Sequence, residues 1–270
     1  KADFGFDPYL IKYTKKHEVE KTAPTGTFER GAKLTNLCFV MMTEYSKLLG
    51  AASGAKVAFP PELVSMPLGR AISEAGLTQL RMSESEKERF VTFYFNGQQE
   101  IQYQGERRII IPSPKVATYD KKPEMSAREL TDSLIREMTD SGNYSFILVN
   151  YANADMVGHT GSIGAAVTAC EVIDECVGKV ANTALSRGGI VLITADHGNA
   201  EEMIDAQTGQ IDTEHSSYPV PFIVISKELF GKPQTLQRGI LADVAPTILK
   251  LLDIPVPSSM TGRNLLEEIF

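Results

Sequence analysis

The chain has 270 residues, of which 43% are hydrophobic and 23% charged, and its 27 Lys and Arg against 34 Asp and Glu give a net charge of -7. This composition is typical of a folded globular protein with one large or two modest domains, and an acidic chain without a basic cluster excludes nucleic acid as its main partner. The sequence has no apolar run of about 18 residues and no signal peptide, and its three cysteines are too few for a disulfide framework. We therefore expect a soluble, cytoplasmic protein without a membrane partner.

The first part of the chain gives few signals of regular structure. Residues 36–42 (NLCFVMM) favour a strand, and residues 50–61 combine Gly, Ala and Ser with two prolines, which is typical of a linker. Because residues 1–49 are too few for a domain of their own, we interpret them as the remnant of a second domain or as an appendage. The main domain is then expected over residues 62–270.

Helix and strand signals alternate after the linker. Residues 68–75 predict a helix, and the β-branched and aromatic run 90–95 (FVTFYF) predicts a strand. Ser126 and Glu129 have the spacing of a capping box, which predicts a helix that begins there and ends near residue 138. The other expected elements are strands at 108–111, 146–149, 190–194 and 222–225 and helices at 163–188 and 242–252.

The alternation of elements predicts the fold class. In the long helix the helical period is followed by Ile163, Val167, Cys170, Ile173 or Asp174, Val177, and Val180 or Ala181. Strands that alternate with helices predict an α/β fold with a mainly parallel sheet, covered by helices on both faces. Ligands of such sheets bind beyond the carboxyl ends of the strands.

Polar side chains gather next to three of the predicted strands. Asp155 and His159 follow one strand and are one helical turn apart, while Asp196 and His197 follow the next strand and His215 precedes the last. Imidazoles and carboxylates without a thiolate suit Mn²⁺ or Zn²⁺, and two adjacent divalent ions can clamp the oxygens of a phosphoryl transfer. The alternative is that Asp196 and His197 cap a helix and His215 lies in a surface loop. Because all three clusters lie at strand ends, we favour the metal site.

Three segments resemble the metal motifs of cofactor-independent phosphoglycerate mutase, a family of the alkaline phosphatase superfamily: residues 153–161 (NADMVGHTG), 194–201 (TADHGNAE) and 215–222 (HSSYPVPF). These motifs alone indicate only the superfamily. The narrower resemblance depends on further segments in family order, at 42–45 (MTEY), 57–61 (VAFPP), 85–87 (SEK), 111–120 (IPSPKVATYD) and 123–127 (PEMSA). The resemblance covers nearly everything from about residue 36 to the C-terminus.

The resemblance implies a fold, a reaction and a set of ligands. The fold is alkaline-phosphatase-like, and the reaction is the isomerisation of 3-phosphoglycerate to 2-phosphoglycerate in glycolysis at two divalent ions. Mn²⁺ is the first choice of metal, with Zn²⁺, Co²⁺ or Mg²⁺ as alternatives. Asp155, His159 and His215 would hold one ion, and Asp196 and His197 would contribute to the second. Residues 1–49 would be a remnant of the family's substrate-gripping domain.

Lys87 matches a family lysine that binds the substrate and neutralises the phosphoryl group in transfer. The residues alone favour another interpretation, in which Lys87 is one of several solvated charges in the run 84–89. Only the resemblance favours a role in the site. The family is about twice as long, and we find neither its Asp-Gly strand with the nucleophilic serine nor its paired-arginine loop. We therefore expect the nucleophile in a missing N-terminal half. Ser113, which follows a predicted strand and lies between two prolines, is the internal alternative.

Three functions are considered. The first is the C-terminal, metal-binding part of a phosphoglycerate mutase. The second is a phosphatase, a phosphodiesterase or another mutase of the same superfamily, which would not be expected to share residues 57–61 and 123–127. The third is an inactive metal-binding fragment with a structural role. Activity on phosphoglycerate compared with an aryl phosphate separates the first two, and an assay of the chain with Mn²⁺ tests the third.

Overall fold

The computed structural model describes residues 36, 38–44, 55–231 and 235–267. The chain divides into two compact units, residues 1–63 and 64–270. In the first unit, β1 (Val40–Met41) pairs in parallel with β2 (Lys56–Val57). The strand predicted over 36–42 is thus only two residues long, with Leu37 outside the described residues. Most of the predicted remnant and linker also lies outside them, so both stay predictions.

The second unit contains a parallel sheet with β3 (Gln79–Glu84) in the middle. This strand pairs with β4 (Glu106–Ile111) on one side and with β5 (Phe146–Val149) on the other. β6 (Val191–Thr194) and β7 (Phe222–Ile225) form a separate antiparallel pair. The expected parallel sheet is therefore formed by β3–β5, while β7 pairs with β6 in the antiparallel direction. A parallel return needs a crossover, usually helical, and no helix lies between β6 and β7.

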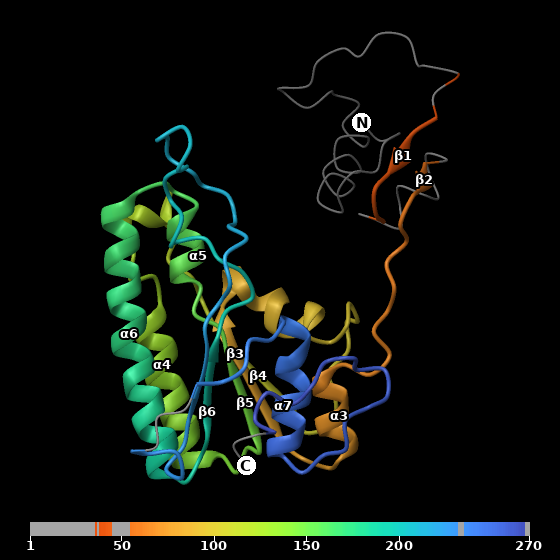
Figure 1. The fold of residues 1–270 in the computed structure, drawn as a ribbon. Coiled ribbons are helices and arrows are strands. Elements are labelled where there is room, and N and C mark those ends of the chain that lie inside the picture. The colour runs from red at the N-terminus through yellow and green to blue at the C-terminus, as the bar shows by residue number, and fades with distance from the viewer. Residues whose placement is uncertain (1–35, 37, 45–54, 232–234, 268–270) are drawn as a thin grey trace, which may run out of the picture. The chain divides into compact units, whose positions relative to one another are not determined.

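Helices cover both faces of the parallel sheet (Figure 1). α4 (Ala127–Arg136), continued by the π-helix η5 (Glu137–Ser141), and α6 (Ile163–Ser186) lie on one face. Their core includes Leu80, Met82, Leu130 and Leu134, all completely buried. Phe146 of β5 instead packs in the cluster formed by α3 (Leu68–Glu74) and α7 (Val244–Leu251). The remaining described helices are the 3₁₀ turns η2 (Ser85–Lys87), η4 (Tyr119–Lys121) and η6 (Leu241–Asp243), the π-helix η3 (Phe90–Tyr94) and α5 (Asn153–Gly158).

The strand predicted over 90–95 is wrong, because this run is the π-helix η3. Short apolar runs do not distinguish strand from helix, and here the helical form has one hydrogen bond from β3 and one side-chain bond within its own stretch. Arg81 donates to the carbonyl of Val91 at 3.1 Å, and Thr92 Oγ1 donates to the carbonyl of Glu88 at 2.8 Å. The sequence also gave no prediction for β3, because Arg81 and Glu84 are unusual residues for a strand in which every residue is buried.

Two local predictions about helices are only partly confirmed. α4 begins as predicted, but no capping box forms, because Ser126 Oγ donates to the carbonyl of Pro112 at 2.8 Å and Ser126 makes no side-chain cap bond. In α6 the periodic positions lie only partly in the core, because Ile163 and Val167 are 45% and 53% exposed whereas Ala181 is buried and Val180 packs against the core. The buried face consists of Ala166, Ala169, Val172, Cys176 and Ala181, since small side chains allow neighbouring elements to approach closely.

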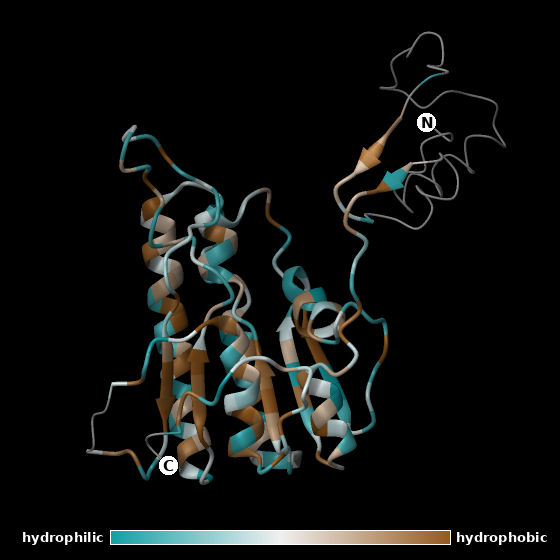
Figure 2. Ribbon diagram, turned by 45° about the vertical axis from the view of Figure 1, so that its right-hand side comes forward, coloured by the Kyte–Doolittle hydropathy of each residue, from teal (hydrophilic) through white to brown (hydrophobic). Residues whose placement is uncertain are grey.

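The hydropathy of the residues agrees with this layering. β5, β6 and β7 consist almost entirely of hydrophobic residues, and the helices combine hydrophobic and hydrophilic residues (Figure 2). Among the described residues, none of the helices is both long enough and apolar enough to cross a membrane.

Candidate metal centre

Asp155 and His159 lie just beyond the carboxyl end of β5. The chain leaves β5 and forms the short helix α5, and the amide of His159 donates to the carbonyl of Asp155 at 3.1 Å. This single turn places both side chains on one face, as their spacing predicts. Asn153 anchors the start of α5, since its Nδ2 donates to the carbonyl of Pro123 at 2.8 Å.

His215 joins these two residues from the loop that precedes β7. Its Nε2 lies 3.1 Å from His159 Nε2 and 3.3 Å from Asp155 Oδ1, and His159 Nε2 lies 3.1 Å from the same oxygen. Ligands held at about 2.1 Å from one ion are about 3.0–3.4 Å apart when their bond angles are near 90–109°. The triangle of Asp155, His159 and His215 therefore fits the donor set of one divalent ion.

A hydrogen bond fixes the tautomer of His159. The carbonyl of Thr213 lies 2.7 Å from His159 Nδ1 and can only accept, so Nδ1 carries the proton. In the neutral imidazole, the lone pair of Nε2 then faces His215 and Asp155. Metal-binding histidines commonly use this arrangement, in which the outer nitrogen donates to a carbonyl or carboxylate.

The two oxygens of Asp155 have different partners. Oδ1 faces the histidines and accepts from Asn199 Nδ2 at 3.0 Å, while Oδ2 forms an ion pair with Lys87 Nζ. Burial raises the pKa of Asp155, but the contacts with Lys87 and Asn199 outweigh it and bring the pKa below its usual value. The carboxylate is therefore ionised at neutral pH.

Lys87 is not part of a solvated run of charges. Its side chain is only 8% exposed, at the end of η2, and its Nζ lies 4.2 Å from the centre of the Phe90 ring. The turn that carries it is held by a neighbouring loop, because the amide of Glu86 donates to Ser113 Oγ at 3.3 Å and Tyr119 donates to Glu86 at 2.7 Å. Ser113 lies beside this turn.

Asp196 and His197 lie next to the triangle but do not join it. The ring of His197 stacks on that of His215, with centroids 3.7 Å apart. Its Nε2 lies 3.6 Å from Asp196 Oδ2, and the Asp196 side chain is 57% exposed. Among the described residues, these two supply at most part of a second ligand set.

Asn199 and Glu201 support the site, although the sequence assigned a role to neither. Glu201 accepts from the amide of Asn199 at 2.8 Å and also from the hydroxyl of Ser216, the residue after His215. Burial raises the pKa of Glu201, but these hydrogen bonds outweigh it and keep the pKa below its usual value. The only available signal was their position inside the segment 194–201.

Gly158 is needed for the approach of Asn199 to Asp155. A Cβ atom added at Gly158 would lie 2.2 Å from Asn199 Oδ1, which is shorter than any real contact. The glycine of this motif therefore provides space for a side chain that orients Asp155.

Comparisons with known proteins agree with this chemistry. The sequence model of the metalloenzyme superfamily matches residues 13–256. The 2,3-bisphosphoglycerate-independent phosphoglycerate mutases of Chloroflexus aggregans and Cellvibrio japonicus are 47% identical over 267 residues and 52% identical over 240 residues. These matches cover 96% and 88% of this chain but 48% and 45% of the relatives. The chain thus spans about half the length of the curated relatives it matches.

A solved structure shows the same fold. The Leishmania mexicana phosphoglycerate mutase, crystallised at low cobalt concentration, matches with a TM-score of 0.69 and 26% sequence identity. The match covers 89% of this chain and 46% of that protein. The predicted alkaline-phosphatase-like architecture is therefore confirmed.

Proposed function

The chain belongs to the metalloenzyme superfamily, and we propose that it is the metal-binding part of a cofactor-independent phosphoglycerate mutase. Its reaction is the interconversion of 3-phosphoglycerate and 2-phosphoglycerate in glycolysis, in the cytoplasm. The observation that carries the proposal is the triangle of Asp155, His159 and His215 with Lys87 bonded to its carboxylate. Relatives named as phosphoglycerate mutases over 96% of this chain support it.

The proposed ligand sets follow from the positions of the side chains. Asp155, His159 and His215 would hold one divalent ion, and Asp196 and His197 would give two ligands to a second ion. A mixed set of imidazoles and carboxylates favours Mn²⁺, with Zn²⁺, Co²⁺ or Mg²⁺ as alternatives. When bound, such ions supply positive charge to the oxygens of a transferring phosphoryl group.

Lys87 supplies a fixed cation beside the metal centre. A phosphoryl group in transfer spreads negative charge over its equatorial oxygens, and a preorganised cation stabilises that charge. Asp155 Oδ2 and the Phe90 ring hold the ammonium group in place, in a position from which bulk water is largely excluded. We assign Lys87 to phosphoryl binding on this basis.

We place the nucleophilic serine and the substrate-gripping arginines in a missing N-terminal half. The relatives are about twice as long as this chain, which supports that placement. Among the described residues, β5 pairs only with β3 and β6 only with β7, so each has an edge that a further strand could pair with. Ser113 remains the internal alternative for the nucleophile.

The proposal is tested by supplying the other half. Residues 1–270 are joined to the N-terminal half of the Cellvibrio japonicus relative and compared with the chain alone, both with Mn²⁺. We expect the joined protein to isomerise phosphoglycerate and to be a poor aryl phosphatase, with the activity lost in Asp155→Ala.

Three other results would contradict parts of the proposal. Strong isomerase activity of the chain alone would place the nucleophile in this chain, with Ser113 as the first residue to replace. Preferential hydrolysis of aryl phosphate would favour a phosphatase. A joined protein that is folded and binds Mn²⁺ but lacks both activities would favour a structural role.

A further inference from the structure

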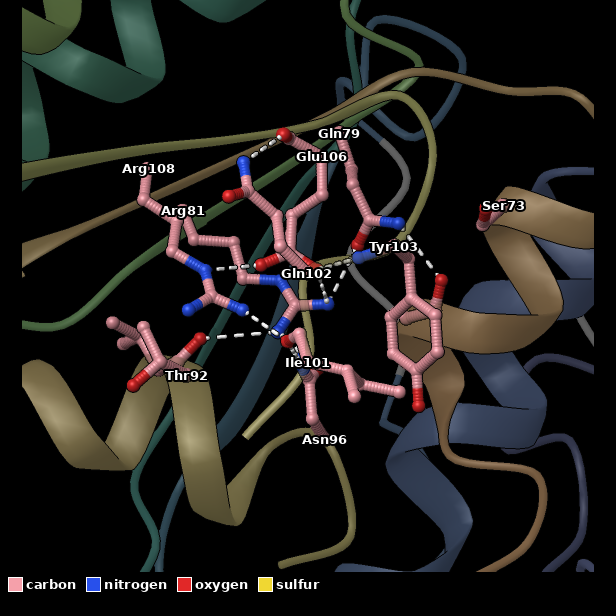
Figure 3. Close-up of polar contacts among 12 residues, drawn as sticks. Ser73, Gln79, Arg81, Thr92, Asn96, Ile101, Gln102, Tyr103, Glu106 and Arg108 are labelled. Carbon is pink, nitrogen blue, oxygen red and sulfur yellow. Dashed lines mark hydrogen bonds and ion pairs between the residues drawn. The ribbon is translucent and has the colours of Figure 1, made fainter. Parts of the chain in front are cut away.

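A second polar cluster is buried between the sheet and the helices η3 and α3 (Figure 3). Its centre is Arg81 of β3, whose side chain is completely buried. Gln79, Asn96 and Glu106 surround it and are also buried. None of these residues belongs to the metal centre, so the proposed reaction gives no direct reason for burying a guanidinium group here.

The guanidinium group joins three segments of the chain (Figure 3). Its Nη1 donates to the carbonyl of Val91 at 3.1 Å and to Asn96 Oδ1 at 2.6 Å, and thus holds η3 and the turn after it. Its Nη2 donates to Gln79 Oε1 at 2.8 Å and lies 3.4 Å from Glu106 Oε2 on β4. The planar fork of arginine allows these contacts to be made together, which a lysine ammonium cannot reproduce.

Gly69 of α3 provides the space for this arrangement. A Cβ atom added at Gly69 would lie 1.9 Å from Arg81 Nη2. Gln79, which accepts from Arg81, also bonds to this glycine, since its Nε2 donates to the carbonyl of Gly69 at 2.8 Å. The position of the guanidinium group is therefore fixed from the side of α3 as well.

Fold stability alone is a weak reason for burying this group. A buried ion pair often gains no more free energy than apolar residues of the same volume, because both charges lose their hydration. Arg81 Nε has no hydrogen-bond partner among the described residues, which adds to the cost. Burial lowers the pKa of Arg81 to about 10, with Glu106 acting against the shift, so the group is still a cation at neutral pH. The cluster instead fixes the positions of the segments that are bonded to Arg81.

One of these segments also carries Lys87. Residues 85–94 form one continuous helical stretch, which begins as η2 and ends as η3. Lys87 lies one turn before Val91, the residue whose carbonyl Arg81 holds. We propose that Arg81 is a positioning residue for Lys87, and that by tying the far end of this stretch to β3 it keeps the ammonium group at Asp155. The catalytic meaning of this rests on the function proposed above, whereas the structural link does not.

The test measures the environment of Lys87 directly. Arg81→Met removes the fork, and Gly69→Ala displaces it while keeping its charge, so the second variant serves if the first does not fold. Gly178→Ala is the matched control, because a Cβ atom there meets nothing within 4 Å in another helix. Arg108→Met is a second control, since Arg108 also pairs with Glu106 but has no hydrogen bond to residues 85–96.

Two measurements distinguish a specific displacement of Lys87 from a general loss of stability of the chain. Reductive methylation followed by peptide mass analysis reports the reactivity of Lys87, with the 70% exposed Lys121 as internal standard. Hydrogen exchange compares the amides of residues 85–97 with those of α4. In Arg81→Met and Gly69→Ala we expect about 10- to 100-fold faster reaction at both Lys87 and residues 85–97, since the bonds lost are made by a charged group. Both control variants and α4 should stay within about twofold of the unmodified chain.

The joined protein then shows whether positioning matters for the reaction. We expect a lower kcat with little change in KM for Mn²⁺-loaded Arg81→Met, and only partial recovery in Arg81→Lys. Unchanged Lys87 reactivity in both test variants would overturn the proposal, as would equal acceleration of α4. Raised reactivity together with unchanged kcat would overturn the positioning role of Arg81. If Lys87 becomes more reactive in the variants but the joined protein without substitutions is inactive, the link between Arg81 and Lys87 is supported and the proposed function is contradicted.

Discussion

Glu201→Gln should weaken metal binding although Glu201 is not one of the proposed ligands. Its carboxylate accepts from Asn199, which donates to Asp155, and from Ser216, which follows His215 in the chain. It thereby connects the two loops that bring the ligands together. A glutamine keeps the shape but loses the charge and one acceptor.

The size of the effect follows from these contacts. A hydrogen bond to a charged group contributes about 1.5–3 kcal/mol, and loss of a residue that orients metal ligands typically lowers metal affinity about 10- to 100-fold. We expect a loss in that range for Mn²⁺, measured by calorimetric titration at pH 7. The pKa of Glu201 is already below its usual value, so the unmodified residue is fully ionised in this assay.

Glu202→Gln is the matched control. It removes the same charge one residue away, and the Glu202 carboxylate has no hydrogen bond or ion pair among the described residues. Long-range electrostatic effects on the ion are therefore similar in the two variants. Mn²⁺ binding to Glu201→Gln within twofold of Glu202→Gln would refute the reasoning.

Four further outcomes are expected. Lys87→Ala should lower the transfer rate of the joined protein about 10²- to 10³-fold while Mn²⁺ affinity stays nearly constant, as measured by kinetics and calorimetry on one preparation. Asp196→Asn should abolish turnover but keep the first ion, so metal analysis should find about one ion per chain; full activity would exclude the second ion. Gly158→Ala should displace Asn199 and weaken Mn²⁺ binding, unlike Gly164→Ala, whose added Cβ meets nothing within 4 Å. Asp243→Asn should destabilise the chain by about 2–4 kcal/mol, because the Asp243 carboxylate accepts from the amides of Ile240 and Arg263. The pKa of Asp243 is lowered in the folded chain, so this stabilisation is present above about pH 4 and is lost on acidification. Urea unfolding at pH 7 and at low pH measures both effects.

Much of the fold could be predicted because its buried strands and helices have regular apolar patterns. β5, β6, β7, α3 and α7 lie where those patterns place them. β3 was missed because it carries Arg81, whose burial depends on Val91 of η3, Asn96 and Glu106 of β4, all ten or more residues away in the sequence. The run 90–95, predicted as a strand, is helical over 90–94, and its Val91 carbonyl accepts from the same arginine. Local propensity contains no information about such a contact.

Some residues of the candidate site could likewise be predicted from the sequence, and others could not. Asp155 and His159 are four residues apart, so one helical turn brings them together without any knowledge of the fold. His215 could be placed near them only by the rule for strand ends and by the family resemblance. Asn199 and Glu201 bond to main-chain groups and to side chains of other loops, and no spacing in the sequence reveals such partners. Ligands are thus easier to predict than the residues that orient them.

The position of Lys87 explains why rate and metal affinity should separate. Asp155 directs Oδ1 towards the two histidines and Oδ2 towards Lys87 Nζ, so the ion and the lysine use different oxygens of one carboxylate. Removing the lysine leaves the three ligand atoms and their orienting hydrogen bonds from Asn199 and to Thr213 in place. The loss would then fall on the share of the phosphoryl oxygens' negative charge that Lys87 is proposed to stabilise beside the ions. A large fall in Mn²⁺ affinity in Lys87→Ala would mean that the lysine instead holds Asp155 in its orientation.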